Sequence, residues 1–183
     1  MNTELKAYTL SVLCEDIPGV LSQVARLFSR KGYNIETICA GPAKPGTTRI
    51  SVVTICDAAA IHQIFTQLSK LLPVISVEVL PDEVSIRRQL MMVKVKADTK
   101  DSREDIIQIT NVFRGNIVDF GTNSLVIAIV GDHEKSQAFL RLMEEFGVLE
   151  TAQTGTVALA RGSNTIYDQN KTKEEYNYGK NVL

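Results

Sequence analysis

The residues best suited to bind a small charged molecule lie in the stretch "EDIPGVLSQVARLFSRKGYNIET", positions 15–37. Pro18-Gly19 opens an amphipathic segment there. Proline suits the first position of a helix, and glycine leaves the helix N-terminus uncovered by a side chain. The first N–H groups of the helix would then be free to bind a carboxylate, which the helix dipole also favours. Asp16 could instead cap these N–H groups itself, and the sequence leaves both interpretations open.

The other end of such a molecule could be held by Asn34, which follows the helix. Its side chain offers an acceptor to an ammonium group and a donor to a carboxylate, although asparagine after Gly32 is also typical of a turn. Val20, Leu21 and Ile35 would form a wall for an aliphatic side chain. The pattern predicts a site for a small zwitterion, with the candidate residues Asp16, Gly19, Val20, Leu21, Asn34 and Ile35.

The titratable residues do not indicate a catalytic site. His62 and His133 are the only histidines, and each starts a predicted helix in polar surroundings, which favours a surface position. Cys14 lies beside the loop, but no histidine near it would lower its pKa and generate a thiolate. Glycine-rich phosphate or dinucleotide motifs are absent from the sequence. We therefore predict no catalytic residue, and no cofactor or metal held by this chain.

The composition indicates a globular protein without attraction to nucleic acid or anionic membranes. The 183 residues include 22% charged ones and carry a net charge of −1, so no strong field surrounds the protein. The longest apolar runs, such as "LVIAIV", are far shorter than the ~20 residues of a membrane helix. The first residues lack the hydrophobic region of a signal peptide. The three cysteines are widely spaced, which is typical of reduced thiols in a cytoplasmic protein.

The elements that must position the loop follow the order β-α-β-β-α-β. Alternating apolar residues predict strands over 8–14, 33–40, 48–56 and 74–80. Helical spacing predicts helices over 20–28 and 61–72, the first ending at Arg30, Lys31 and Gly32. This order predicts the ferredoxin-like arrangement, in which four antiparallel strands carry two helices on one face.

The same pattern recurs in the second half of the chain. Strands are expected over 90–97 and 148–160, a hairpin around "GTN", and helices with apolar stripes at 106–113 and 139–146. "LFSRKGYNIET" and "VFRGNIVDF" occupy equivalent places. We predict an α+β protein of two tandem ferredoxin-like domains, residues 5–81 and 89–162, joined by a linker at 82–88. The polar tail, residues 163–183, would be flexible or would dock on a partner.

Both faces of the predicted first sheet carry apolar residues. Val53 and Ile55 point to one face, and Ile50 and Val52 to the other. The two helices cover a single face, so the apolar residues on the other face favour burial by a second copy. We therefore expect a homodimer.

"EDIPGVLSQVARLF" followed by "GYNIE" resembles the ligand loop and first helix of ACT domains, which are amino-acid-sensing modules. "IRRQLMMVKV" and "NVFRGNIVDF" extend the similarity. From about residue 5 to residue 162 the chain resembles the small, regulatory subunits of acetolactate synthase (acetohydroxyacid synthase). Residues 5–81 would then be the ACT domain.

This resemblance implies a non-catalytic partner of an enzyme. The family's catalytic large subunit carries thiamine diphosphate, FAD and Mg²⁺, and condenses pyruvate with pyruvate or 2-oxobutyrate towards valine, leucine and isoleucine. The small subunit raises that activity and confers feedback inhibition, usually by valine. Family ACT domains pair into one eight-stranded sheet, with effectors between the protomers. The motif carries the effector role onto the six candidate residues named above.

Two other classes of function remain to be weighed. The first is an autonomous amino-acid-sensing ACT regulator of another enzyme or of transcription, although the chain has neither a helix-turn-helix pattern nor a basic arm. The second is a small enzyme on the same fold, for which no catalytic pair is available. The "DTKDSRED" loop of the second domain lacks the Pro-Gly opening, which favours a structural or partner-facing role.

Overall fold

The computed structural model describes residues 4–168, which form two compact units. Of the described residues, the first unit contains 4–86 and 156–168, and the second unit is Arg87–Gly155. Each unit has its own buried apolar core.

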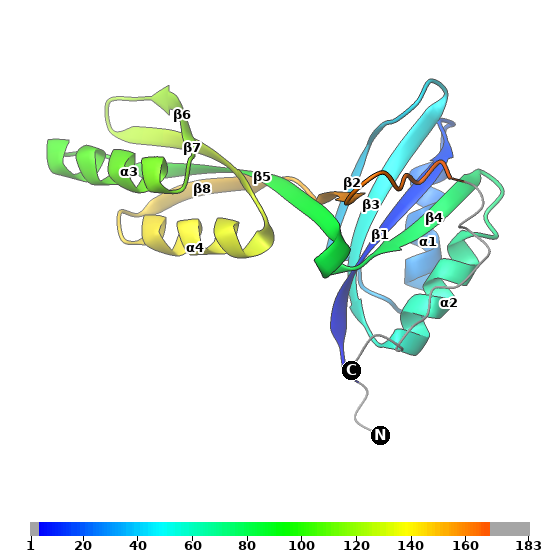
Figure 1. Cartoon of the computed structure of the whole chain (residues 1–183). Helices are drawn as coiled ribbons and strands as arrows, with labels where there is room; N and C mark the ends of the chain where they lie inside the picture. Colours follow the sequence, from blue (N-terminus) through cyan, green and yellow to red (C-terminus); the bar gives the residue numbers. More distant parts are fainter. Residues whose placement is uncertain (1–3, 169–183) are drawn as a thin grey trace. The chain divides into compact units, whose positions relative to one another are not determined.

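The first unit is a four-stranded antiparallel sheet with two helices on one face (Figure 1). The strands are β1 (Lys6–Glu15), β2 (Thr37–Pro42), β3 (Thr47–Cys56) and β4 (Val74–Leu80), in the order β2-β3-β1-β4. The helices are α1 (Val20–Lys31) and α2 (Ala58–Leu68). The ferredoxin-like prediction is therefore confirmed for this unit.

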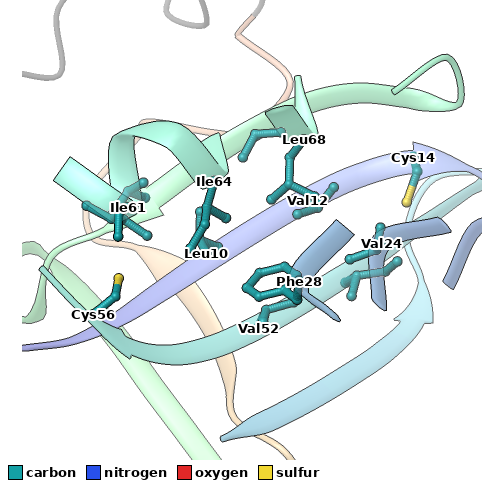
Figure 2. Close-up of a cluster of buried hydrophobic side chains, with 14 of the residues drawn as sticks. Leu10, Val12, Cys14, Val24, Phe28, Val52, Cys56, Ile61, Ile64 and Leu68 are labelled. Atoms are coloured by element: carbon teal, nitrogen blue, oxygen red, sulfur yellow. The ribbon is translucent and has the colours of Figure 1, made fainter. Parts of the chain in front are cut away.

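The core of the first unit lies between the sheet and its two helices. Alternate residues of β1 face the helices, as the two-residue repeat of a strand requires. One apolar stripe on each helix packs against them. Figure 2 shows these side chains meeting: Leu10, Val12 and Cys14 from β1, Val24 and Phe28 from α1, and Ile61, Ile64 and Leu68 from α2.

The C-terminal end of α1 was predicted correctly. Gly32 adopts the left-handed conformation with φ 72°, which glycine takes without a steric penalty. Its N–H donates to the carbonyl of Ser29, and the N–H of Tyr33 donates to the carbonyl of Phe28. Arg30 and Lys31 lie in the last turn, where positive charge suits the helix dipole.

The second unit repeats the fold. Its elements are β5 (Ser85–Lys96), α3 (Lys100–Val112), β6 (Asn116–Phe120), β7 (Ser124–Gly131), α4 (His133–Glu144) and β8 (Val148–Gln153). The strand order β6-β7-β5-β8 matches that of the first sheet. Phe139 is fully buried. Its ring packs edge-on against that of Phe113, with 5.4 Å between the ring centroids. The prediction of two tandem units is confirmed.

The junction between the two halves differs from the expected linker at 82–88. One 3₁₀ turn, Asp82–Val84, follows β4, and β5 then begins at Ser85. The hydroxyl of Ser85 donates to the carbonyl of Pro81 at 2.7 Å. The second half of the expected linker is therefore strand, because alternate residues from Ser85 onward are buried.

The chain after β8 also differs from the prediction. The expected strand at 148–160 is interrupted, and a separate strand β9 (Val157–Ala160) pairs with β5. The N–H of Arg161 then donates to the carbonyl of Val84 at 2.8 Å. Residues 156–168 thus belong to the first unit, whereas the expected second domain ran to 162.

Residues 162–168, which we name the strap, lie on the first unit. Ile166 is only 7% exposed, and its carbonyl accepts a hydrogen bond from the Ser76 hydroxyl at 2.9 Å. The expectation of a flexible or partner-docked tail from 163 is therefore wrong for the strap. The rest of that predicted tail, 169–183, lies outside the described residues.

Two leucines at the end of α2 test this description of the core. Leu68 is fully buried, whereas Leu72, which the sequence pattern placed on the same stripe, is 97% exposed because α2 ends at Leu68. We expect Leu68→Ala to lower the free energy of unfolding by about 2–5 kcal/mol. The matched control Leu72→Ala should change it by less than about 0.5 kcal/mol. Urea denaturation followed by circular dichroism measures both, and equal losses would contradict this packing.

Candidate functional site

The loop between β1 and α1 is held at its start by backbone and side-chain hydrogen bonds. The N–H of Glu15 donates to the carbonyl of Pro73, and the N–H of Asp16 donates to the carbonyl of Gly46, each at 2.9 Å. The hydroxyl of Thr48 donates to the Asp16 carboxylate at 2.9 Å. Asp16 thus links the β1–α1 loop to the turn between β2 and β3 and to the start of β3 by hydrogen bonds.

Gly19 is the residue that precedes the first turn of α1, with φ 85° and no side-chain cap. Pro18 therefore lies one position before this cap, and the expectation that it occupies the first helical position is wrong. The alternative that Asp16 caps the helix is also wrong, because its carboxylate binds Thr48 instead. Gly19 takes the N-cap position because glycine adopts a positive φ without strain, and Pro18 therefore stays outside the helix.

The N-terminus of α1 has free N–H groups. The N–H of Val20 donates to the carbonyl of Ile17 at 3.4 Å. The N–H of Gln23 donates to the carbonyl of Gly19, which is the first regular hydrogen bond of the helix. Within residues 4–168, the N–H groups of Leu21 and Ser22 have no acceptor. Such groups at the positive end of a helix dipole are suited to a carboxylate.

The other helices of residues 4–168 have side-chain caps. Asp57 caps α2 and Asp132 caps α4. Thr99 caps α3 in a reciprocal capping box with Ser102. In this pattern each of the two side chains accepts a hydrogen bond from the backbone N–H of the other residue. Among the described α-helices, α1 alone is left without a side-chain cap, which makes its N-terminus the candidate anion site of this chain.

The apolar surface beside this N-terminus differs from the prediction. Val20 is 6% exposed and its side chain packs in the core, so it forms no wall of a site. Leu21 and Ile17 are each 43% exposed. Sequence reasoning missed Ile17, whose signal was an isolated apolar residue in a polar loop.

Asn34 lies at the other end of α1, before β2 rather than within a strand as expected. Its carbonyl accepts from the Thr54 hydroxyl, and its side-chain amide donates to the Glu36 carboxylate, both at 2.6 Å. The next residue, Ile35, is half-buried against the core. Glu36, which the sequence analysis overlooked, therefore places a negative charge beside Asn34.

A single chain does not bring the predicted site residues together. Asp16 is bonded to Thr48 and Asn34 to Thr54, and these two threonines are six residues apart on β3. At about 3.4 Å per residue, that separation is roughly 20 Å. The 12-residue helix α1 between them spans about 18 Å. The described chain therefore presents two half-sites at opposite ends of α1.

The cysteines near the sheet are poor nucleophiles. Burial raises the pKa of the Cys14 thiol, and the Asp16 carboxylate raises it further. Cys14 donates to the Thr48 carbonyl at 3.4 Å. Burial raises the pKa of Cys56, and the negative charge of Asp57 raises it further, to about 11. The prediction of a core position is confirmed for Cys14 and Cys56, which are buried, while Cys39 is half-buried.

Neither metal-site chemistry nor a membrane span is present in the part of the chain that the structure describes. In residues 4–168, no three His, Cys, Asp or Glu side chains are grouped so as to hold a metal ion. The helices there are too short or too polar to cross a membrane. His62 and His133 are exposed at the starts of α2 and α4, as expected.

Comparison with known proteins agrees with this architecture. Residues 10–76 match the family model described as "AHAS small subunit-like ACT domain", and residues 88–162 match "Small subunit of acetolactate synthase". The probable acetolactate synthase small subunit of Methanothermobacter thermautotrophicus is 44% identical over 164 residues, covering 89% of this chain and 98% of that protein. The chain belongs to the family of acetolactate synthase small subunits.

Two further family members extend the comparison. The acetolactate synthase small subunit of Mycobacterium bovis is 43% identical over 162 residues, which cover 88% of this chain and 96% of that protein. The crystal structure of the small subunit from Thermotoga maritima has a TM-score of 0.81 at 33% identity, covering 87% of this chain and 99% of that one. The family likeness therefore includes both units.

The cysteine environments predict an order of alkylation. In the native protein at pH 8, iodoacetamide should modify half-buried Cys39 before Cys14 and Cys56. With a pKa of about 11, Cys56 is about 0.1% thiolate at that pH. Its modification rate should rise about tenfold per pH unit above pH 8, because the thiolate is the reactive form. Peptide mass spectrometry measures the rates, with the urea-unfolded chain as control. Modification of Cys56 as fast as Cys39 would contradict this order.

Proposed function

We propose that this chain is the regulatory subunit of an acetolactate synthase. It would bind the catalytic large subunit, raise its activity and confer feedback inhibition by valine or another branched-chain amino acid. Family membership supports the association, and the uncapped N-terminus of α1 supports a carboxylate-containing effector. Thiamine diphosphate, FAD and Mg²⁺ would belong to the catalytic partner, none of them to this chain, and the complex would act in the cytoplasm.

The observation that carries the effector proposal is the separation of the two half-sites by the length of α1. A molecule as small as an amino acid cannot span about 18 Å. In an isologous dimer each copy presents the same surface in the opposite direction. Pairing through the β2 edge would place the N-terminus of α1 in one copy beside Asn34 of the other. Two equivalent sites would result, each completed by both copies.

The chemistry of each half-site suits one end of an amino acid. The free N–H groups of Leu21 and Ser22 would bind the carboxylate. Asn34 and Glu36 of the second copy would bind the ammonium group, since both side chains carry acceptor oxygens. Leu21 and Ile17 would contact an aliphatic side chain. These groups bind and orient the effector, and they transform nothing.

Effector binding would act by shifting a conformational equilibrium of the dimer. A ligand that contacts both copies favours the arrangement in which its two half-sites are closest. The resulting coupling between effector and catalytic partner would be worth about 1–3 kcal/mol. This magnitude is sufficient to change the activity of a bound enzyme severalfold.

A mixed dimer tests whether the site is shared. Leu21→Glu places an acid beside the N–H groups of α1 and blocks one half-site, while Asn34→Ala removes the other. Each variant alone should bind L-valine at least about tenfold more weakly, as expected for lost hydrogen bonds to charged groups. A dimer of one copy of each contains one intact site, so calorimetry should find one valine per dimer with near wild-type affinity.

The control for this experiment is Asn111→Ala, an exposed asparagine of α3, which should leave valine binding unchanged. Wild-type affinity in Asn34→Ala would exclude that residue. Wild-type binding combined with a mixed dimer that does not bind would show that the site is not shared between copies.

The effect on the enzyme is tested with the catalytic large subunit. Adding this chain should raise the rate of acetolactate formation from pyruvate, and valine should lower it again. Asn34→Ala should keep the activation and lose the valine response, because only effector contacts change. The chain alone, given pyruvate, thiamine diphosphate and Mg²⁺, should form no acetolactate. Turnover by the chain alone would contradict the proposal, and no effect on the large subunit would favour an autonomous regulator.

A further inference from the structure

The helix-free face of the first sheet is unusual because it carries, beside Leu13, several small polar residues that are nevertheless buried. These positions alternate with the core residues of β1 and its neighbours, so they point away from α1 and α2. Their exposed fractions are 0–5%: Thr9, Ser11, Leu13, Ser51 and Ser76. The strap, drawn in orange in Figure 1, runs across these strands. Its own Ile166 is buried there.

The strap is held by specific contacts at each of its last residues. The Ser76 hydroxyl on β4 donates to the carbonyl of Ile166 at 2.9 Å. The ammonium group of Lys44 lies 3.8 Å from the centre of the Tyr167 ring, a cation–π contact. The N–H of Thr165 donates to the Asp168 carboxylate at 2.8 Å, which closes a turn around these two residues.

Beneath the strap lies a partly buried cation. The Nε of Arg49 donates to the Ser11 hydroxyl at 2.7 Å. Burial lowers the pKa of Arg49, and Glu78 and Tyr167 act in the opposite direction. Tyr167 is therefore near two cations, Arg49 on β3 and Lys44 in the turn between β2 and β3. This environment favours an aromatic residue with a polar tip at that position.

The strap lies at the end of the sheet from which the candidate effector loop emerges. Leu13 pairs with Arg49 on one side and Ser76 on the other, two residues before Glu15. Lys44 belongs to the turn between β2 and β3, whose Gly46 carbonyl accepts from the N–H of Asp16. A continuous series of contacts therefore leads from Tyr167 through this turn to the effector loop.

We propose that the strap is a regulatory clamp, in which the contact of Tyr167 with Lys44 fixes the β2–β3 turn and thereby the effector loop. Docking of the strap and binding of the effector are then coupled, each strengthening the other. The strap follows β9, with which the chain re-enters the first unit after Gly155. This inference rests on the proposed function, because it concerns the same amino-acid site.

The test is calorimetric titration of L-valine into the full chain, four variants of the strap contact and one control variant. Tyr167→Ala removes the ring, and Lys44→Gln removes the cation at an exposed position. Each should weaken valine binding about fivefold, the lower end of typical coupling between sites. The double variant should bind no more weakly than either single one, since both remove one contact. Tyr167→Phe keeps the ring and should bind as wild type does. Lys70→Gln, an exposed lysine after α2, is the matched control.

Hydrogen exchange separates a clamp from a cover that only adds stability. Tyr167→Ala should speed exchange at the N–H of Asp16, which donates to the turn, more than at core amides of β1. Wild-type valine affinity in both single variants would overturn the clamp, as would equal acceleration at all these amides. If the wild-type chain binds no branched-chain amino acid, alone or with the catalytic subunit, the proposed function itself fails. These outcomes distinguish the two hypotheses.

Discussion

Burial of β1 on both faces is the constraint on which the rest of the first unit depends. Leu10, Val12 and Cys14 pack against the helices, and Thr9, Ser11 and Leu13 are covered on the other face, all at 0–2% exposure. A four-stranded sheet with helices on one face leaves the opposite face open. Closing it requires chain from outside the repeat, and the strap supplies that chain. The same strand ends at Glu15, so its position also determines where the candidate effector loop begins.

The length of α1 imposes the second constraint, because it separates a donor-rich end from an acceptor-rich one. The first end offers free N–H groups beside Gly19, and the second offers Asn34 with Glu36. Val20, Val24 and Phe28 pack along the sheet on one stripe of this 12-residue helix, so packing in the core fixes the positions of its two ends. This separation is the reason why the effector site proposed above would be shared between two copies.

The parts of this structure that follow from local pattern could be predicted from sequence. The alternation in β1, the stripes of α1 and α2 and the left-handed Gly32 are each decided by neighbouring residues. The errors lie where distant contacts decide. Val20 was expected to line the site but packs into the core. Leu72 extends the stripe of α2 after the helix has ended. Ile166 is one apolar residue in a polar segment, and it is buried where its carbonyl accepts a hydrogen bond from Ser76 on the distant strand β4.

The two units share one fold but differ at the N-terminus of their first helix, where the proposed effector would bind in the first unit. Both units have the same strand order. The N-cap of α3 is Thr99, whose side chain accepts a hydrogen bond from an N–H of the first turn. The N-cap of α1 is Gly19, which has no side chain to do so. Glycine in place of a capping side chain costs a helix only about a few tenths of a kcal/mol, so leaving α1 uncapped has a small cost in stability. Hydrogen bonds from Asp16 and Glu15 to neighbouring segments offset part of this cost by ordering the loop. The open helix end would therefore be preorganised for the carboxylate of the proposed effector, which would make the hydrogen bonds that α1 itself leaves unmade.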